Sequence, residues 1–260
     1  MTIAGFDPSA GAGTLADIKT MSAFGCYGVA AITSLTFQNT QGVYGAAHQP
    51  KDVVSQQLTS LFDDFNIAAI KTGMLPTEEV IEEVARQIAE RPLPYVVVDP
   101  VVRSTSGYDL IDDQALKVLI EKLFPLASVV TPNAVEAERI TGIAIKDAHS
   151  MAHAAEKIVA LGAKAVIIKG GDMVSEDALD FLMDADGSLL YTAKKVQSSN
   201  THGTGCTLSS ALACLLPLGY GLREALPIAK KYIVEAIRTA PNIGHGYGPL
   251  NHFPPEFGME

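Results

Sequence analysis

Five consecutive residues, His202-Gly203-Thr204-Gly205-Cys206, combine groups that could bind an anion and accept a proton. They precede a run of small and apolar residues, 207–213, that predicts a helix. Two glycines at a helix start let backbone N–H groups converge on one point, where the positive end of the helix dipole also favours an anion. A thiol in that first turn is expected to accept a proton better than a free cysteine does. The stretch therefore suggests transfer of a charged group to a hydroxyl.

Cys206 is open to three interpretations from the residues alone. Cysteine is often buried as a small apolar residue. A nucleophile with His202 as its base would suit acyl transfer, although His202 lies on the other side of the glycine turn and need not point at the thiol. A general base that acts on a substrate hydroxyl uses the same position at the helix start without needing the histidine.

A second glycine-rich stretch, 11–16, formally fits the dinucleotide-binding pattern GxGxxA. Its context argues against that function, because Gly11 lies six positions after Gly5 at the end of a predicted strand instead of following the strand directly. We expect this loop to let a small ligand approach the backbone closely. The sequence has no Gly-Lys dipeptide, HExxH or GxSxG, which excludes a P-loop and the common zinc-peptidase and serine-hydrolase sites. A nucleotide phosphate would have to bind at the 203–205 turn.

Charged side chains follow other predicted strands. Asp99 and Glu136 lie near the ends of two successive strands and could hold Mg²⁺, often through waters. Asn133 and Glu136 also match a helix-capping pattern, and both roles are compatible because a cap fixes the geometry of the glutamate. Lys169 ends a predicted buried strand beside two glycines, so we expect it to pair with a phosphate or with one of these carboxylates.

The elements that must position these residues alternate along the chain. Predicted strands are 1–5, Val29–Thr36, Ile67–Thr72, Tyr95–Asp99, Ser128–Thr131 and Ala165–Lys169. Predicted helices are Thr14–Phe24, Asp52–Phe62, Thr77–Arg91, Asp112–Lys122, Ala134–Thr141, Ser150–Leu161, and segments near 206–218 and 222–239. Residues 178–196 predict an antiparallel hairpin. This alternation predicts an α/β protein with a mainly parallel sheet covered on both faces, as one domain over 1–260.

The unusual residues recur at the carboxyl ends of the predicted strands, where ligands bind in open α/β sheets. Gly5-Phe6-Asp7 follows the first strand, Gln38-Asn39 the second and 71–74 the third, and the next three strands end in the same way. One such coincidence carries little weight. Six in sequence predict a single site along one edge of the sheet.

Composition narrows the class of partner and compartment. Apolar residues make up 48% of the chain and charged residues 18%, which is typical of a globular protein. The net charge of −10 argues against a nucleic acid or an acidic membrane as partner. No apolar run is long enough to span a membrane, and we expect no secretory leader. The three cysteines, Cys26, Cys206 and Cys214, form neither a disulfide framework nor a zinc motif, so a cytoplasmic location is expected.

Taken together, these residues resemble one family over the whole chain. The resemblance is to the hydroxymethylpyrimidine/phosphomethylpyrimidine kinases of thiamine biosynthesis, which belong to the ribokinase-like superfamily. The segments that carry it are Gly5–Gly13, Ala16–Thr20, Gln38–Thr40, Lys71–Leu75, Val98–Val101, Thr131–Ala137, Asn200–Cys206, Gly244–Pro249 and Asn251–Phe253. It implies a ribokinase-like three-layer α/β/α fold with a mainly parallel central sheet.

The resemblance also implies a function. The expected reaction is ATP-dependent phosphorylation of the hydroxymethyl group of an aminopyrimidine, and then of the resulting monophosphate. ATP and Mg²⁺ are the implied cofactors, and family members are commonly homodimers. Gln38 offers one donor and one acceptor, which complement the amino group and the adjacent ring nitrogen of an aminopyrimidine.

Roles are implied residue by residue. Cys206 is the expected base, and Gly203, Thr204 and Gly205 together with Cys206 supply the expected anion hole. Gly5, Ala12, Met74 and Val101 would form walls for the ring that Gln38 binds. The expected contacts of the nucleotide are Lys169, Asn133 and Thr131, and those of the metal are Asp99 and Glu136.

Some positions depart from the family pattern, and rival functions remain. Phe6 replaces a small hydroxyl residue, and Ala10 replaces a glycine. Ser104-Thr105-Ser106-Gly107 stands where Ala-Lys-Ser-Gly is usual, with Arg103 close by. If Arg103 does not replace the family's lysine, the second phosphorylation is in doubt. The nearest rival is a pyridoxal kinase of the same superfamily, or dual activity. A silent anion-binding module and a nucleophilic cysteine enzyme are rivals from other classes.

Overall fold

A computed structural model describes residues 1–91, 93–103, 107, 109–171, 173 and 177–255. Its centre is a nine-stranded sheet in the order β3-β2-β1-β4-β5-β6-β7-β8-β9. The strands are β1 (Thr2–Phe6), β2 (Ala30–Asn39), β3 (Gly42–His48), β4 (Ile70–Thr72), β5 (Val96–Val98), β6 (Val129–Val130), β7 (Val166–Lys169), β8 (Asp177–Asp184) and β9 (Gly187–Lys194). From β2 to β7 in this order the neighbouring strands run parallel, whereas β3, β8 and β9 pair antiparallel.

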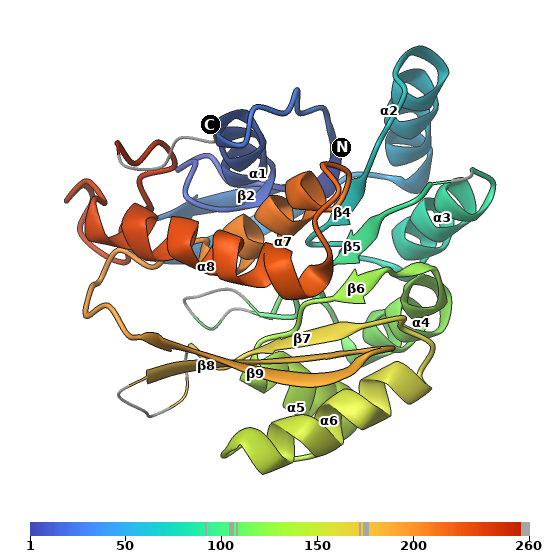
Figure 1. Cartoon of the computed structure of the whole chain (residues 1–260). Coiled ribbons are helices and arrows are strands. Elements are labelled where there is room, and N and C mark those ends of the chain that lie inside the picture. The colour runs from blue at the N-terminus through green and yellow to red at the C-terminus, as the bar shows by residue number, and fades with distance from the viewer. Residues whose placement is uncertain (92, 104–106, 108, 172, 174–176, 256–260) are drawn as a thin grey trace.

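Helices cover both faces of this sheet (Figure 1). They are α1 (Gly13–Ala23), α2 (Lys51–Asp64), α3 (Glu78–Ala89), α4 (Asp113–Leu123), α5 (Ala134–Thr141), α6 (Ala148–Ala160), α7 (Thr204–Leu215) and α8 (Leu222–Arg238), with a short 3₁₀ turn at Phe124–Leu126. Side chains of α2 to α6 build one apolar core, and those of α1, α7 and α8 build the other. The predicted three-layer arrangement with a mainly parallel sheet is confirmed.

The central strands are apolar because both of their faces are covered. Val96, Val97 and Val98 are all buried, and they alternate between the two cores. A strand with two covered faces reads as a continuous apolar run, and this property made the run recognisable in the sequence. Residues that follow these strands therefore leave the core at one edge of the sheet.

The structure corrects several boundaries. The second strand does not end before Gln38 and Asn39 but includes them as the last residues of β2. After a turn the chain returns as β3, an edge strand that the sequence did not predict, because its Gly-Ala-Ala centre lacks β-branched residues. Helix α7 begins at Thr204, two residues before the predicted start. In the described residues no helix is long and apolar enough to cross a membrane.

One ion pair is fully enclosed between the sheet and two helices. The Nζ of Lys71 on β4 lies 2.8 and 3.0 Å from the carboxylate oxygens of Asp17 on α1, and both side chains are completely buried. Asp17 also accepts hydrogen bonds from Thr2 on β1, at 2.6 Å, and Ser210 on α7, at 2.7 Å. Burial of a charge is tolerated only with such complete pairing, so four elements are tied to one carboxylate.

We expect Lys71→Met to destabilise the fold strongly. The substitution leaves Asp17 charged, buried and unpaired by a cation, a change that typically costs about 3–5 kcal/mol. Urea unfolding measures the free energy. The matched control is Lys117→Met, which breaks an exposed ion pair with Glu121 and should cost about 0.5 kcal/mol or less. Equal losses in the two variants would contradict the role given to the buried pair.

Candidate functional site

A cavity of about 730 Å³ opens at the carboxyl ends of the parallel strands. All of the site residues predicted from the sequence line it except one. Those that line it are Gly5, Ala12, Gln38, Met74, Asp99, Val101, Asn133, Glu136, Lys169, Gly203, Thr204, Gly205 and Cys206. Thr131 does not line the cavity but lies behind it, fully buried. The predicted convergence of the strand ends on one site is thus present in the structure.

The glycine turn at the start of α7 is built for close approach. Gly203 has a φ of 85°, in the left-handed region, and a Cβ there would overlap the carbonyl oxygen of Gly11. Thr204 N–H donates to the carbonyl of Thr201 at 3.3 Å, so it is not a free donor. The N–H groups of Gly205 and Cys206 have no acceptor in the part of the chain that the structure describes. The turn therefore offers these two N–H groups, at the positive end of a helix, to an anion.

The thiol of Cys206 lies beside this turn, half-buried. Burial raises its pKa to about 11, with Asp17 and Asp99 acting in the same direction, while Lys71 and the N–H of Gly13 oppose the rise. We expected the thiol to accept a proton better than a free cysteine because a helix start by itself lowers a thiol pKa; burial reverses that effect on the pKa here. Desolvation outweighs the helix dipole, because the thiolate would be a charge with little water around it.

His202 does not face Cys206. Its Nε2 lies 2.9 Å from a carboxylate oxygen of Asp7, and among the described residues it has no hydrogen bond to the thiol. A cysteine nucleophile with His202 as its base would need that contact. The geometry disfavours this interpretation of the Cys206 position.

Asp99 and Lys169 form a buried pair next to the turn. Lys169 Nζ lies 2.9 Å from Asp99 Oδ1, and Thr131 donates to the same oxygen at 3.1 Å. Ser209 of α7 donates to the other oxygen at 3.3 Å. Burial alone would raise the pKa of Asp99, but Lys169 and Lys71 reverse this and hold it below its usual range. Thr131 is thus a support for Asp99.

Glu136 combines a capping role with a place in the cavity. Its Oε2 accepts from the N–H of Asn133 at 2.7 Å, and Asn133 Oδ1 accepts from the N–H of Glu136 at 2.9 Å, which completes a capping box at α5. Burial raises the pKa of Glu136 to about 7, while Lys169 lowers it and Asp99 raises it further. The predicted cap is confirmed, and the capped carboxylate also faces the cavity.

Apolar side chains form part of the cavity wall. Met74 packs its sulfur close to Gly5, where an added Cβ would lie 3.1 Å from it, and Ala12 and Val101 line the cavity nearby. Gln38 lines the same cavity with its amide, at a register shift near the end of β2. Such a wall, apolar with one amide, suits a flat heteroaromatic ring.

The structure describes three of the positions that depart from the family pattern. Ala10 adopts a φ of 58°, a left-handed conformation that favours glycine, so the alanine is strained there. Phe6 lines the cavity. Arg103 lines it too and forms an exposed ion pair with Asp109 at 2.9 Å. Thr105 lies outside the described residues.

Other cavity residues were not assigned a role from the sequence. Lys230 on α8 pairs with the buried Asp180 of β8 at 2.6 Å, and Asp180 also accepts from the N–H of Gly170 at 3.3 Å. Neither residue belongs to a sequence motif, so their place in the cavity wall became visible only from the contact between α8 and β8 in the structure. Asp7 and His202 were visible as unusual residues, but 195 positions separate them, and no pattern in the sequence indicates their pairing.

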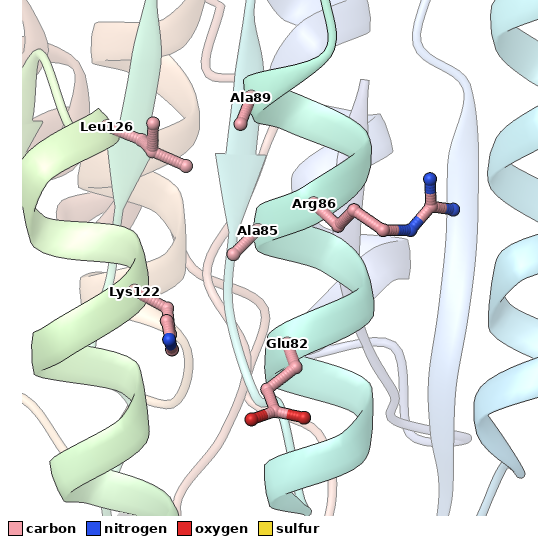
Figure 2. A pocket seen from close by; sticks show the side chains of 6 residues that line it. All are labelled: Glu82, Ala85, Arg86, Ala89, Lys122 and Leu126. Atoms are coloured by element: carbon pink, nitrogen blue, oxygen red, sulfur yellow. The ribbon is translucent and has the colours of Figure 1, made fainter.

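A second hollow lies between α3 and α4, apart from these residues (Figure 2). It has a volume of about 330 Å³ and is lined by Glu82, Ala85, Arg86, Ala89, Lys122 and Leu126. Arg86 is held by Glu83 and Glu90 at 2.7 Å each and points away from the hollow in Figure 2. None of the predicted site residues lines it, so it has no part in the site.

The thiol pKa values predict an order of alkylation. A thiolate, not a thiol, reacts with iodoacetamide. Hydrogen bonding with Cys214 lowers the pKa of Cys26 to about 7, whereas that of Cys206 is about 11. At pH 8 we expect peptide mass spectrometry to find Cys26 modified and Cys206 largely unmodified, with Cys206 labelling still rising above pH 10. Faster labelling of Cys206 than of Cys26 at neutral pH would contradict the raised pKa of Cys206. In the Cys26→Ala variant the labelling rate of Cys206 is measured without a contribution from Cys26.

Comparison with known proteins places the chain in a family. The family model described as phosphomethylpyrimidine kinase matches residues 7–251. A hydroxymethylpyrimidine/phosphomethylpyrimidine kinase of Rhizobium meliloti is 44% identical over 97% of this chain and 96% of its own length. A thiamine biosynthesis bifunctional protein of Geobacter sulfurreducens is 46% identical over 97% of this chain, which spans only about half, 51%, of that longer relative.

A solved structure extends the comparison to the fold. The pyridoxal kinase of Staphylococcus aureus, solved with pyridoxal and with AMP-PCP, is 33% identical and superimposes with a TM-score of 0.90 over 98% of this chain and 93% of its own. This likeness confirms the ribokinase-like fold. The identity to the pyrimidine kinase of Rhizobium is higher than that to the pyridoxal kinase. With a family match over nearly its whole length, the chain belongs to the phosphomethylpyrimidine kinase family and is a phosphotransferase.

Proposed function

We propose that the protein transfers the γ-phosphoryl group of ATP to 4-amino-5-hydroxymethyl-2-methylpyrimidine, and then phosphorylates the monophosphate to the diphosphate, as a step of thiamine biosynthesis. The observation that carries this proposal is one cavity with Gln38 on an apolar wall and Cys206 beside two free N–H groups. The S. aureus kinase in complex with AMP-PCP, an ATP analogue, supports ATP as the donor. Residues 1–260 would act as one catalytic unit.

The acceptor ring would lie against the apolar wall. Gln38 retains a carbonyl acceptor and an N–H donor for the amino group and the neighbouring ring nitrogen of the pyrimidine. Gly5, Ala12, Met74 and Val101 would enclose the ring faces. A ring held in this way places its hydroxymethyl group in a fixed position, which converts a bimolecular step into an intramolecular one.

Phosphoryl transfer would depend on charge stabilisation. The N–H groups of Gly205 and Cys206 are fixed donors for the oxygens of the transferring phosphoryl group, and they need not reorganise as charge develops. Lys169 lies where a Cβ on Gly205 would be 3.1 Å from its Nζ, so its charge is close to the same point. Asn133 and Lys169 would contact the nucleotide phosphates, with Thr131 acting through Asp99.

Cys206 would accept the proton of the hydroxymethyl group. In the fraction of enzyme that carries Cys206 as a thiolate, the oxygen attacks the γ-phosphorus and its O–H proton moves to Sγ. The bond from the γ-phosphorus to the oxygen shared with the β-phosphate breaks, and ADP leaves. A base with a pKa near 11 takes up this proton strongly once it is deprotonated. Because little of the thiol is deprotonated at neutral pH, activity should rise with pH wherever this proton transfer limits the rate.

The donor set fits Mg²⁺ bound together with phosphate. Mg²⁺ uses one or two carboxylates and completes its shell with waters and substrate phosphates. Asp99 and Glu136 face one cavity, and the described residues contain no group of three or more His, Cys, Asp or Glu side chains that could form an all-protein site. These two carboxylates would hold the ion, directly or through water, and the ion would neutralise phosphate charge when bound.

The second phosphorylation places a phosphate on the acceptor side of the cavity. Arg103 lines the cavity two positions after Val101, and its only ion pair within the described residues is the exposed one with Asp109. An exposed pair of this kind is weak, so the guanidinium is available to a phosphate. We propose further that the enzyme works in the cytoplasm, where ATP is supplied, and as a homodimer.

Replacement of the proposed base should abolish turnover selectively. General bases contribute about 10²–10⁴ in rate, so we expect Cys206→Ala to lose at least about 100-fold in kcat while ATP binding by calorimetry stays nearly intact. Cys26→Ala is the control, because it removes a thiol outside the cavity. Equal activity in Cys206→Ala and the unsubstituted enzyme would eliminate Cys206 as the base.

Steady-state kinetics with three acceptors tests the substrate. Hydroxymethylpyrimidine, its monophosphate and pyridoxal are compared in a coupled assay of ADP release. We expect kcat/KM to be highest for the two pyrimidines, because Gln38 complements the aminopyrimidine edge. A preference for pyridoxal would overturn the substrate but leave the phosphotransfer chemistry standing.

A further inference from the structure

The carboxylate of Asp7 is the most heavily bonded polar group in the cavity wall. One oxygen accepts from the N–H and the hydroxyl of Ser9, at 2.8 and 2.7 Å. The other accepts from the N–H groups of Gly11 and Ala12, at 3.2 and 2.8 Å, and from Nε2 of His202 at 2.9 Å. The residue is only 2% exposed. One buried carboxylate thus organises the loop after β1 and reaches the segment before α7.

This carboxylate stays charged. Burial alone would raise the pKa of Asp7, but hydrogen bonds from His202, Ser9 and Gln38 hold it well below the usual range. A buried charge without such donors would be costly, so the surrounding groups are arranged for it. Ala12, one of the residues proposed to enclose the ring, donates its N–H to this carboxylate at 2.8 Å, whereas His202 directly precedes the anion-binding turn.

Steric contacts as well as the hydrogen bond to Asp7 restrict the position of His202. A Cβ on Gly11 would overlap the His202 ring, and a Cβ on Gly203 would overlap the carbonyl oxygen of Gly11. The N–H of His202 donates to the carbonyl of Gly248 at 3.1 Å, which holds the backbone from the other side. His202 is therefore held directly before the left-handed turn, with its imidazole against the loop after β1 and its backbone bonded to the segment near Gly248.

We propose that Asp7 and His202 are positioning residues that join the acceptor-binding wall to the anion-binding turn. Nε2–H of His202 donates to Asp7, and this bond sets the position of Gly203 and of the N–H groups that follow it. The inference rests on the proposed function, since it gives the turn its role in phosphoryl transfer. It assigns His202 no contact with the reacting atoms and no proton transfer to Cys206.

Two amide variants of His202 test whether the position of its N–H donor matters, because both carry the same polar group at different distances from the backbone. His202→Gln places an N–H donor near the position of Nε2, whereas His202→Asn carries the same amide one methylene short of it. We expect the glutamine variant to stay within about threefold of the unsubstituted kcat. We expect the asparagine variant to lose about 10-fold or more, because a small misplacement of a catalytic turn is costly, while its KM for the acceptor changes less than about threefold.

A variant of Asp7 tests the second of the two proposed positioning residues. Asp7→Asn weakens the bonds to both sides, so it should lower kcat and also raise KM for the acceptor, through the N–H groups of Gly11 and Ala12. Ser9→Ala is the matched control, because it removes one hydrogen bond to the same carboxylate and touches neither side; its kinetics should stay within about twofold of the unsubstituted enzyme. Thermal unfolding midpoints and the affinity for ADP are measured for each variant.

The outcomes decide between positioning and plain structural support. Equal kcat in the glutamine and asparagine variants, whether retained or lost, overturns the proposal. A loss in kcat that simply follows the unfolding midpoint, with ADP affinity falling in step, also overturns it. All variants are assayed with whichever acceptor the unsubstituted enzyme phosphorylates, so a preference for pyridoxal would refute the proposed substrate without deciding this inference.

Discussion

The close approach of Gly203 to the carbonyl oxygen of Gly11 is the contact on which the rest of the site depends. A left-handed residue without a Cβ is required there, and no other type satisfies both the φ of 85° and the lack of space. This contact brings the start of α7 against the loop that begins α1. As a result, two N–H groups, a thiol and the ring-binding wall share one cavity, although they come from opposite ends of the chain.

The charges around this contact are arranged in pairs. Lys71 is paired with Asp17, and Lys169 with Asp99, while Glu136 lies near the second pair with a pKa of about 7. Paired charges contribute little net field, so burial decides the pKa of the Cys206 thiol and raises it to about 11. An incoming phosphate competes with Asp99 for Lys169. We infer that the site is electrically balanced for the arrival of a highly charged ligand.

Much of this site could be predicted from the sequence, because its residues follow recognisable strands. Continuous valine runs mark the buried strands, and each polar residue that follows such a run must leave the core at the same edge. The antiparallel β3 was missed since its centre, Gly45-Ala46-Ala47, carries no pattern of period two. The Asp7–His202 pair was missed because the sequence holds no record of a contact between distant loops. The thiol pKa was misjudged because the helix dipole can be inferred from the sequence, whereas the depth of burial cannot.

The shortness of the central strands has a consequence for how this protein tolerates change. β4, β5 and β6 are three, three and two residues long, and Asp99 and Thr131 follow β5 and β6 directly. A single peptide unit therefore separates the buried Val98 from Asp99, and another separates the buried Val130 from Thr131. Close-packed interiors transmit strain instead of absorbing it. We expect small changes of volume at Val98 or Val130 to displace Asp99 and its partners even where the fold is retained. The catalytic rate would then report a change in core packing more sensitively than the thermal unfolding midpoint does.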